Sequence, residues 1–95
     1  MRPLAHIDLT DAARALLAQP APHRPDLCAR MIREADWADR YRRRLGRLHD
    51  LWGDGTLSAA ARQRQRAPER RLSDRDYCTC LEMVLHAVLT HQRRA

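Results

Sequence analysis

The fold of this 95-residue chain is decided by residues 30–47, which read RMIREADWADRYRRRLGR. Wound as an α-helix at about 100° per residue, this stretch divides into two faces. One face is apolar, and together with Leu27 it contains Met31, Ala35, Ala38 and Leu45. The opposite face carries Arg30, Arg33, Arg40, Arg44, Arg47 and Trp37, with Tyr41 at the border. We therefore expect a long helix that buries one side and offers guanidinium groups around an indole on the other.

The composition predicts an all-α fold. Hydrophobic residues make up 44% of the chain, Phe is absent, and aromatic residues account for only 4%. Ala and Leu supply most of the apolar content, and both are strong helix formers. No run of residues alternates between apolar and polar as a half-buried strand would. At this length we expect residues 1–95 to form a single domain around one aliphatic core, built as a small compact bundle.

Capping residues and prolines predict where three main helices and one short helix begin and end. Asp8 is a suitable N-cap for a helix over about 9–18 that buries Leu9, Leu16 and Leu17, and the prolines of 20–25 end it. The second helix is expected over about 26–45, with Gly46 as its C-cap. Thr56 should cap a short helix near 57–65. Ser73, with Asp76 three residues on, should open a last helix over 73–91 with an apolar stripe from Tyr77 to Leu89.

The connections between these helices are a tight turn and a basic segment. Trp52-Gly-Asp-Gly-Thr56 matches neither a phosphate-binding loop nor a calcium loop, so we interpret it as a glycine turn with Trp52 packed as a lid on the core. Residues 62–71 contain five arginines and little to bury. We expect that segment to be a mobile, solvated connection.

The charge balance narrows the class of partner. The formal net charge is +6, which favours acidic partners such as nucleic acid, acidic protein faces or anionic lipid. All 18 basic residues are Arg. We attribute this bias mainly to the codon usage of a GC-rich genome, and selection for bidentate recognition of phosphate or carboxylate is the alternative. Three pairs at i,i+4 spacing are expected to reduce the positive field of the second helix: Arg30 with Glu34, Asp36 with Arg40, and Asp39 with Arg43.

No pattern of residues predicts chemistry or a membrane location. Cys78 and Cys80 would lie about 200° apart on a helix, too far to hold one metal ion, and we expect Cys78 to join the apolar face. No spacing indicates paired catalytic carboxylates or a Ser/His/Asp set. Three cysteines, no signal peptide and no apolar run long enough for a membrane span favour a cytoplasmic protein with reduced thiols. We expect no enzyme activity, no cofactor and no metal.

Two functional hypotheses follow. In the first, the chain is a helical adaptor that docks on a larger bacterial protein with an acidic or mixed surface. The contact residues would be Arg33, Trp37, Arg40, Tyr41, Arg44 and Trp52, because Trp, Tyr and Arg dominate interface hot spots. In the second, the chain binds nucleic acid through the same helix and a basic segment on phosphates. The phosphate-binding residues would be Arg62, Arg64, Arg66, Arg70 and Arg71. Association with a second copy is a further alternative, because an alanine-rich core is thin.

Five short motifs also carry a resemblance. They are AARALL at 12–17, ADRYRRR at 38–44, GRLH at 46–49, WGDGTL at 52–57 and DYC at 76–78. Together they resemble a family of short, uncharacterised alphaproteobacterial proteins over most of the chain. The resemblance implies a bacterial, cytosolic protein with an accessory or regulatory role, and it assigns a function to no residue.

Overall fold

The computed structural model describes residues 1–94 and confirms the all-α prediction. Its helices are α1 (His6–Leu17), α2 (Arg24–Leu45), α3 (Leu57–Ala61) and α4 (Arg75–Arg94), and a 3-10 turn at Ala21–His23 precedes α2. Among the described residues there is no β-strand, only an isolated bridge between His49 and Gly53. None of the described helices has the length and apolar composition needed to cross a membrane.

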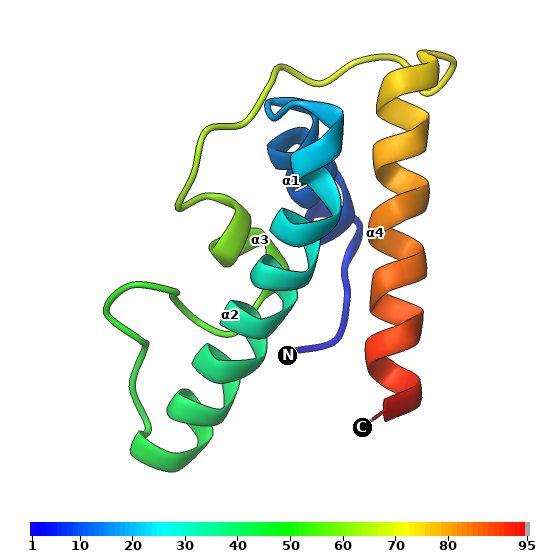
Figure 1. Cartoon of the computed structure of the whole chain (residues 1–95). Helices are drawn as coiled ribbons and strands as arrows, with labels where there is room; N and C mark the ends of the chain where they lie inside the picture. The colour runs from blue at the N-terminus through cyan, green and yellow to red at the C-terminus, as the bar shows by residue number, and fades with distance from the viewer. Residues whose placement is uncertain (95) are drawn as a thin grey trace.

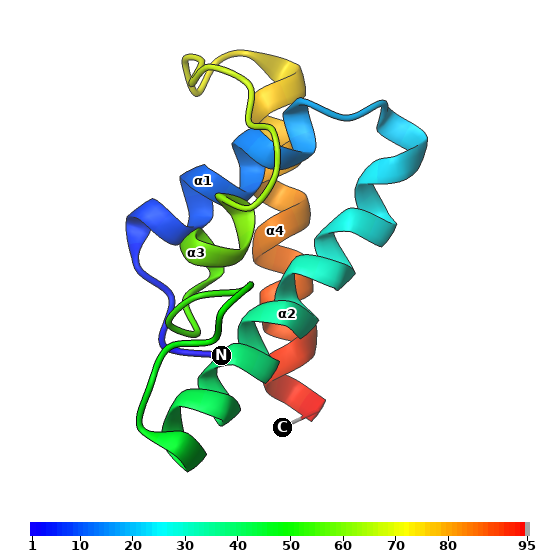
Figure 2. The same cartoon turned by 90° about the vertical axis from the view of Figure 1, so that its left-hand side faces the viewer.

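The two long helices run in the same direction side by side, as Figure 1 shows. Arg24 at the start of α2 pairs with Asp76 at the start of α4, and Asp36 further along α2 lies 3.8 Å from His91 near the end of α4. Helix α1 packs against α3 and α4 (Figure 2). This arrangement leaves the outer side of α2 uncovered along its whole length.

The core is aliphatic apart from one tyrosine. Its largest fully buried side chains are Leu16 of α1, Met31 of α2, Leu57 of α3, and Tyr77 and Val84 of α4. Small residues bring the helices together, because Ala12, Ala13, Ala15, Ala35, Ala60 and Ala61 have no exposed surface. A core of this kind depends on close helix approach more than on bulky side chains.

The structure confirms two of the predicted capping residues and corrects two others. Thr56 caps α3 as predicted, since its hydroxyl accepts a hydrogen bond from the Ala59 N–H at 3.1 Å. Gly46 ends α2 as predicted, with φ +71°. Asp8 is not an N-cap but lies in the first turn of α1, where its carboxylate accepts from the Ala5 N–H at 2.7 Å. Asp74, not Ser73, caps α4 by accepting from the Tyr77 N–H at 3.0 Å.

Several residues expected in the core lie on the surface. Leu45 is 52% exposed, because the last turns of α2 extend beyond the rest of the bundle (Figure 1). Leu85 and Leu89 of α4 are also exposed, as is Cys78, so the apolar stripe of α4 is narrower than predicted. Helix α3 ends at Ala61, not near residue 65.

Candidate functional site

The outer side of α2 presents the predicted interaction residues along one face. Trp37 is 62% exposed, although it is among the largest side chains of the protein. Trp37, Arg40, Tyr41 and Arg44 line one shallow depression together with Leu45. Arg33 lies one helical turn before Trp37 and is also exposed. The structure therefore brings five of the six predicted contact residues onto one rigid helix, and we call this the α2 face.

Tyr41 anchors an aromatic stack that joins the α2 face to the following loop. The His49 ring meets Tyr41 edge to face at 4.9 Å between centroids, and it stacks on Trp52 at 4.6 Å with 7° between the planes. The Arg47 guanidinium lies 5.9 Å from the Tyr41 centroid. Trp52 is therefore linked to the α2 face through His49 and does not form the expected lid on the core. Sequence reasoning missed His49, because nothing in the spacing pairs it with either aromatic residue.

Hydrogen bonds within the loop hold this stack in place. His49 Nδ1 accepts from the backbone N–H groups of Leu51 at 3.0 Å and Trp52 at 3.2 Å. The backbones of His49 and Gly53 exchange two further hydrogen bonds, at 2.9 and 3.1 Å. The loop also exposes Leu48 and Leu51, so large apolar side chains surround the end of α2. Such clustering at one end of a small protein is typical of a contact surface.

Charge on the α2 face is only partly balanced. Arg40 pairs with Asp36 at 3.0 Å, and Arg43 pairs with Asp39, as the i,i+4 spacing predicted. Within residues 1–94, no carboxylate lies within ion-pair distance of Arg33, Arg44 or Arg47. Among residues 1–94, the α2 face thus combines an exposed indole with two guanidinium groups, those of Arg33 and Arg44, that have no acidic partner.

The basic segment after α3 is anchored to the bundle, which corrects the expectation of a mobile connection. Arg62 and Arg66 both bind the carboxylate of Asp11, at 3.1 and 2.8 Å. Arg64 donates to both oxygens of Glu34, at 2.8 and 3.0 Å, and so displaces the predicted Arg30–Glu34 pair. Of the five arginines assigned to phosphate binding, three are thus engaged by carboxylates of α1 and α2.

Arg70 and Arg71, the other two, lie apart from the α2 face just before α4. Both side chains are exposed, and Arg70 is 3.4 Å from Asp74. The structure therefore does not bring the predicted phosphate-binding set together with the arginines of α2 into one basic surface.

Asp11 keeps its charge despite being almost completely buried. Burial alone would raise the pKa of this carboxyl, but hydrogen bonds from Ser58 and Arg62, with the charge of Arg62, hold the pKa below its usual value. Arg14 lies 3.6 Å away as a further cation. The role of this cluster is to fasten residues 62–67 to α1, and Arg14 adds hydrogen bonds to and from Ala67 at 2.8 and 3.0 Å.

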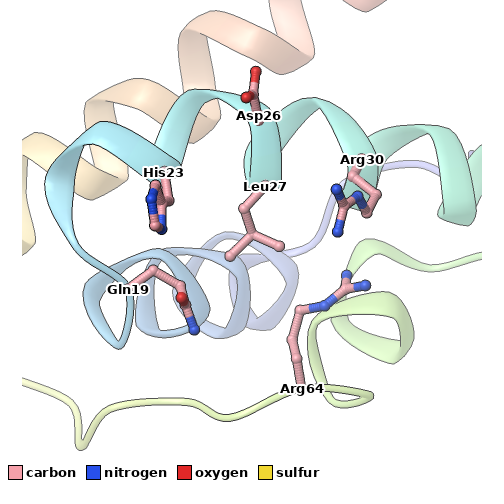
Figure 3. A pocket seen from close by; sticks show the side chains of 6 residues that line it. All are labelled: Gln19, His23, Asp26, Leu27, Arg30 and Arg64. Atoms are coloured by element: carbon pink, nitrogen blue, oxygen red, sulfur yellow. The ribbon is translucent and has the colours of Figure 1, made fainter.

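A separate depression lies on the other flank of α2, between its first turns and Arg64 (Figure 3). His23, Leu27 and Arg30 extend on the side that faces Gln19 and Arg64, while Asp26 points to the opposite side. The Arg64 charge is balanced by Glu34, whereas Arg30 has no ion-pair partner among residues 1–94. The depression therefore keeps one unbalanced guanidinium group, fewer than the α2 face.

The cysteines and acidic residues form no reactive centre in the described part of the chain. Residues 1–94 contain no group of three or more His, Cys, Asp or Glu side chains placed to hold a metal ion. Burial raises the pKa of Cys28 to about 11, with a contribution from Cys80, and burial also raises the pKa of Cys80. Both thiols are thus protonated at neutral pH and poorly nucleophilic.

Comparison with known proteins places the chain in a family. No curated protein and no solved structure matches it. A family model described as a domain of unknown function, DUF7742, matches residues 2–88, which span all but the last turns of α4. The matched range includes the whole α2 face and the Tyr41–His49–Trp52 stack. The chain therefore belongs to the DUF7742 family.

Proposed function

We propose that this protein is a small bacterial, cytoplasmic adaptor or regulator that docks on a larger protein through the α2 face. The contact comprises Arg33, Trp37, Arg40, Tyr41 and Arg44, with Trp52 at its edge. The observation that carries the proposal is the exposure of Trp37 on a long helix, where Arg40 pairs with Asp36 but Arg33 and Arg44 have no acidic partner among residues 1–94. We expect no catalytic activity and no cofactor.

Physical considerations support a protein partner. An exposed indole on a regular helix loses little conformational entropy on binding and can bury a large apolar area. Guanidinium groups around it select acidic or mixed surfaces and increase the rate of association. The exposed leucines at positions 45, 48 and 51 would lie at the border of such an interface, where they help to exclude water.

A nucleic acid is the second candidate, favoured by one observation. Arg33, Arg44 and Arg47 are free to contact phosphates, and Trp37 could stack on an unpaired base. Against it, Arg62, Arg64 and Arg66 are held by Asp11 and Glu34. Moving them to phosphates would break intramolecular ion pairs, so we rank this candidate below the protein partner.

The decisive experiment measures how partner binding depends on Trp37. A photocrosslinking residue at position 48 would capture neighbours in the bacterium, and calorimetry would then measure affinity between the purified proteins. We expect Trp37→Ala to weaken binding about 30-fold or more, as for a hot spot. Leu89→Ala, at an exposed site on α4, serves as the matched control and should change affinity less than about twofold. Equal effects of the two substitutions would refute the proposal.

A parallel measurement separates the second candidate. Fluorescence anisotropy of a labelled random-sequence DNA duplex would be recorded at low and near-physiological salt. Binding with a steep salt dependence, weakened by a similar increment for each arginine removed, would move nucleic acid to first place. A protein adaptor should show no such dependence.

A further inference from the structure

A groove between α2 and α4 lies beside the α2 face and shares only Arg33 with the predicted site. Its volume is about 370 Å³. Helices α2 and α4 form its two walls, and aliphatic and basic side chains line it, among them Ala29, Ile32, Ala87, Arg33, His86 and Arg94. Helices α2 and α4 run in the same direction on either side of it (Figure 1).

The charged side chains that line this groove are of one sign, and the nearby Asp36 carboxylate lies 3.8 Å from the lining residue His91. Arg33 on α2 and Arg94 on α4 have no carboxylate within ion-pair distance among residues 1–94, and no acidic side chain lines the groove. The neighbouring carboxylate of Asp36 is already bound to the Met1 ammonium at 2.6 Å and to Arg40. An occupant that carries carboxylates would therefore meet a guanidinium group on each helix, Arg33 on α2 and Arg94 on α4.

Arg33 connects the groove to the α2 face, because it lines the groove and stands one turn before Trp37. A partner that covers Trp37 and continues along α2 toward its N-terminus would reach the groove next. We infer that the groove receives an acidic segment of the partner, with one aliphatic side chain on Ile32 and Ala87 and carboxylates beside Arg33 and Arg94. This inference rests on the proposed function and specifies the chemistry of the partner.

Other occupants fit this groove less well. A neutral or basic segment would leave two guanidinium groups partly desolvated without a partner, which disfavours binding. Nucleic acid would find two phosphate contacts, but aliphatic side chains such as Ile32 and Ala87 offer bases no aromatic surface to stack on. An acidic segment with an aliphatic residue can pair with the guanidinium groups of the groove and also pack on its aliphatic side chains.

Three capped eight-residue peptides test the inference directly. The first carries glutamates around two leucines, the second replaces the glutamates by glutamines, and the third replaces the leucines by serines. Each would be titrated into the full chain, with the Ile32 and Ala87 methyl groups and the Arg33 and Arg94 Nε–H groups followed by NMR. We expect the first peptide alone to shift all four signals with a measurable affinity. Equal shifts from all three peptides, or none from the first, would overturn the inference.

Single substitutions provide the matched comparison. Arg33→Gln and Arg94→Gln should each weaken binding of the acidic peptide about two- to fivefold, which corresponds to one exposed ion pair. Arg93→Gln removes the same charge from the same helix end, but Arg93 does not line the groove, so it should leave the affinity unchanged. An equal loss with Arg93→Gln would show a general charge effect and refute the groove as the binding site.

The possible failures are distinguishable. If the acidic peptide does not bind in the groove while partner binding still requires Trp37, only the acidic-segment inference fails. If Trp37→Ala leaves partner affinity unchanged, the proposed function fails, whether or not the peptide binds. If duplex DNA shifts the Arg33 and Arg94 signals and the acidic peptide does not, the groove contacts phosphate instead.

Discussion

At the residue scale, one buried carboxylate decides how the arginine-rich segment is used. Asp11 is 1% exposed and receives Arg62, Arg66 and the Ser58 hydroxyl. Because the two arginines come from more than 50 positions further along the chain, these ion pairs close a long loop as well as neutralise a buried charge. The same contacts give both arginines an acidic partner within the protein, although the Arg62 side chain stays 56% exposed.

Asp11→Asn should therefore destabilise the protein and release the segment. The amide cannot neutralise Arg62 and Arg66, but both guanidinium groups can rehydrate, so we expect a loss of about 1–3 kcal/mol. Urea unfolding at neutral pH would measure it. Asp50→Asn, in an exposed loop without an ion-pair partner, is the control and should stay within about 0.5 kcal/mol. Equal stability of the two variants would contradict the role assigned to Asp11.

The pH dependence of stability should follow from the same group. The pKa of Asp11 is lower in the folded protein than its ordinary value, so the folded state favours the ionised form. The resulting stabilisation is present above the unfolded-state pKa of about 3.9 and is lost as the pH falls through the lower folded-state pKa. The difference in unfolding free energy between wild type and Asp11→Asn should thus be constant near neutrality and shrink below about pH 4. A difference that persisted unchanged into that acidic range would refute this assignment.

At the scale of elements, the loop from α2 to α3 is held against α2 by a glycine. Gly55 has φ +93°, and a Cβ added there would lie 2.6 Å from the Cα of Asp39 in α2. Its carbonyl also accepts from the Arg2 N–H at 3.0 Å. This close approach brings the loop back to α2 and allows Trp52 to reach the His49 ring beside Tyr41.

Gly55→Ala and Gly46→Ala form a matched pair that tests this contact. Both glycines have positive φ, but nothing lies within 4 Å of a Cβ added at Gly46. We expect Gly46→Ala to cost about 1 kcal/mol from the left-handed backbone alone, and Gly55→Ala to cost about 2–4 kcal/mol because the loop must also move. Thermal unfolding would measure both. Comparable costs would show that the loop does not need its close approach to α2.

At the scale of the whole molecule, Arg24 joins three helices at one end of the bundle. Its Nε donates to the Leu16 carbonyl at 2.9 Å and the Gln19 carbonyl at 3.0 Å, which ties the end of α1 to the start of α2. Its two terminal nitrogens bind the carboxylate of Asp76 on α4. A buried arginine in this position sets the relative placement of α1, α2 and α4, and hence which side of α2 faces outward.

Arg24→Met should therefore destabilise the bundle while keeping its apolar stem. The Gln19 carbonyl loses the Arg24 donor, the Leu16 carbonyl keeps only the Gln19 N–H, and Asp76 loses its ion pair, so we expect a cost of about 2 kcal/mol in unfolding free energy. Arg30→Met, on the exposed side of the same helix, should change it by less than about 0.5 kcal/mol. Denaturant unfolding of the two variants would show the difference, and a neutral Arg24→Met would mean that packing alone orients the helices.

Much of the fold could be predicted from the sequence, because it depends on neighbours a few positions apart. Helical periodicity identified the long helices and placed Trp37 on the polar side of α2. The caps at Thr56 and Gly46 follow from side-chain and backbone chemistry within one turn. The residues of the α2 face could be named for the same reason, since a single regular helix displays them all.

Only the tertiary structure decided which charges remain free and which aromatic side chains meet. Glu34 pairs with Arg64 and not with Arg30, because an exposed i,i+4 pair contributes only about 0.3–0.5 kcal/mol, and a partly buried pair in which one guanidinium nitrogen donates to both carboxylate oxygens is stronger. Trp52 stacks on His49, and Leu45 stays exposed, because the path of the loop and the length of the bundle are set by contacts distant in sequence. The sequence by itself thus determined the elements and the residues of the candidate face. Packing between distant segments determined how much of the positive charge remains available to a partner.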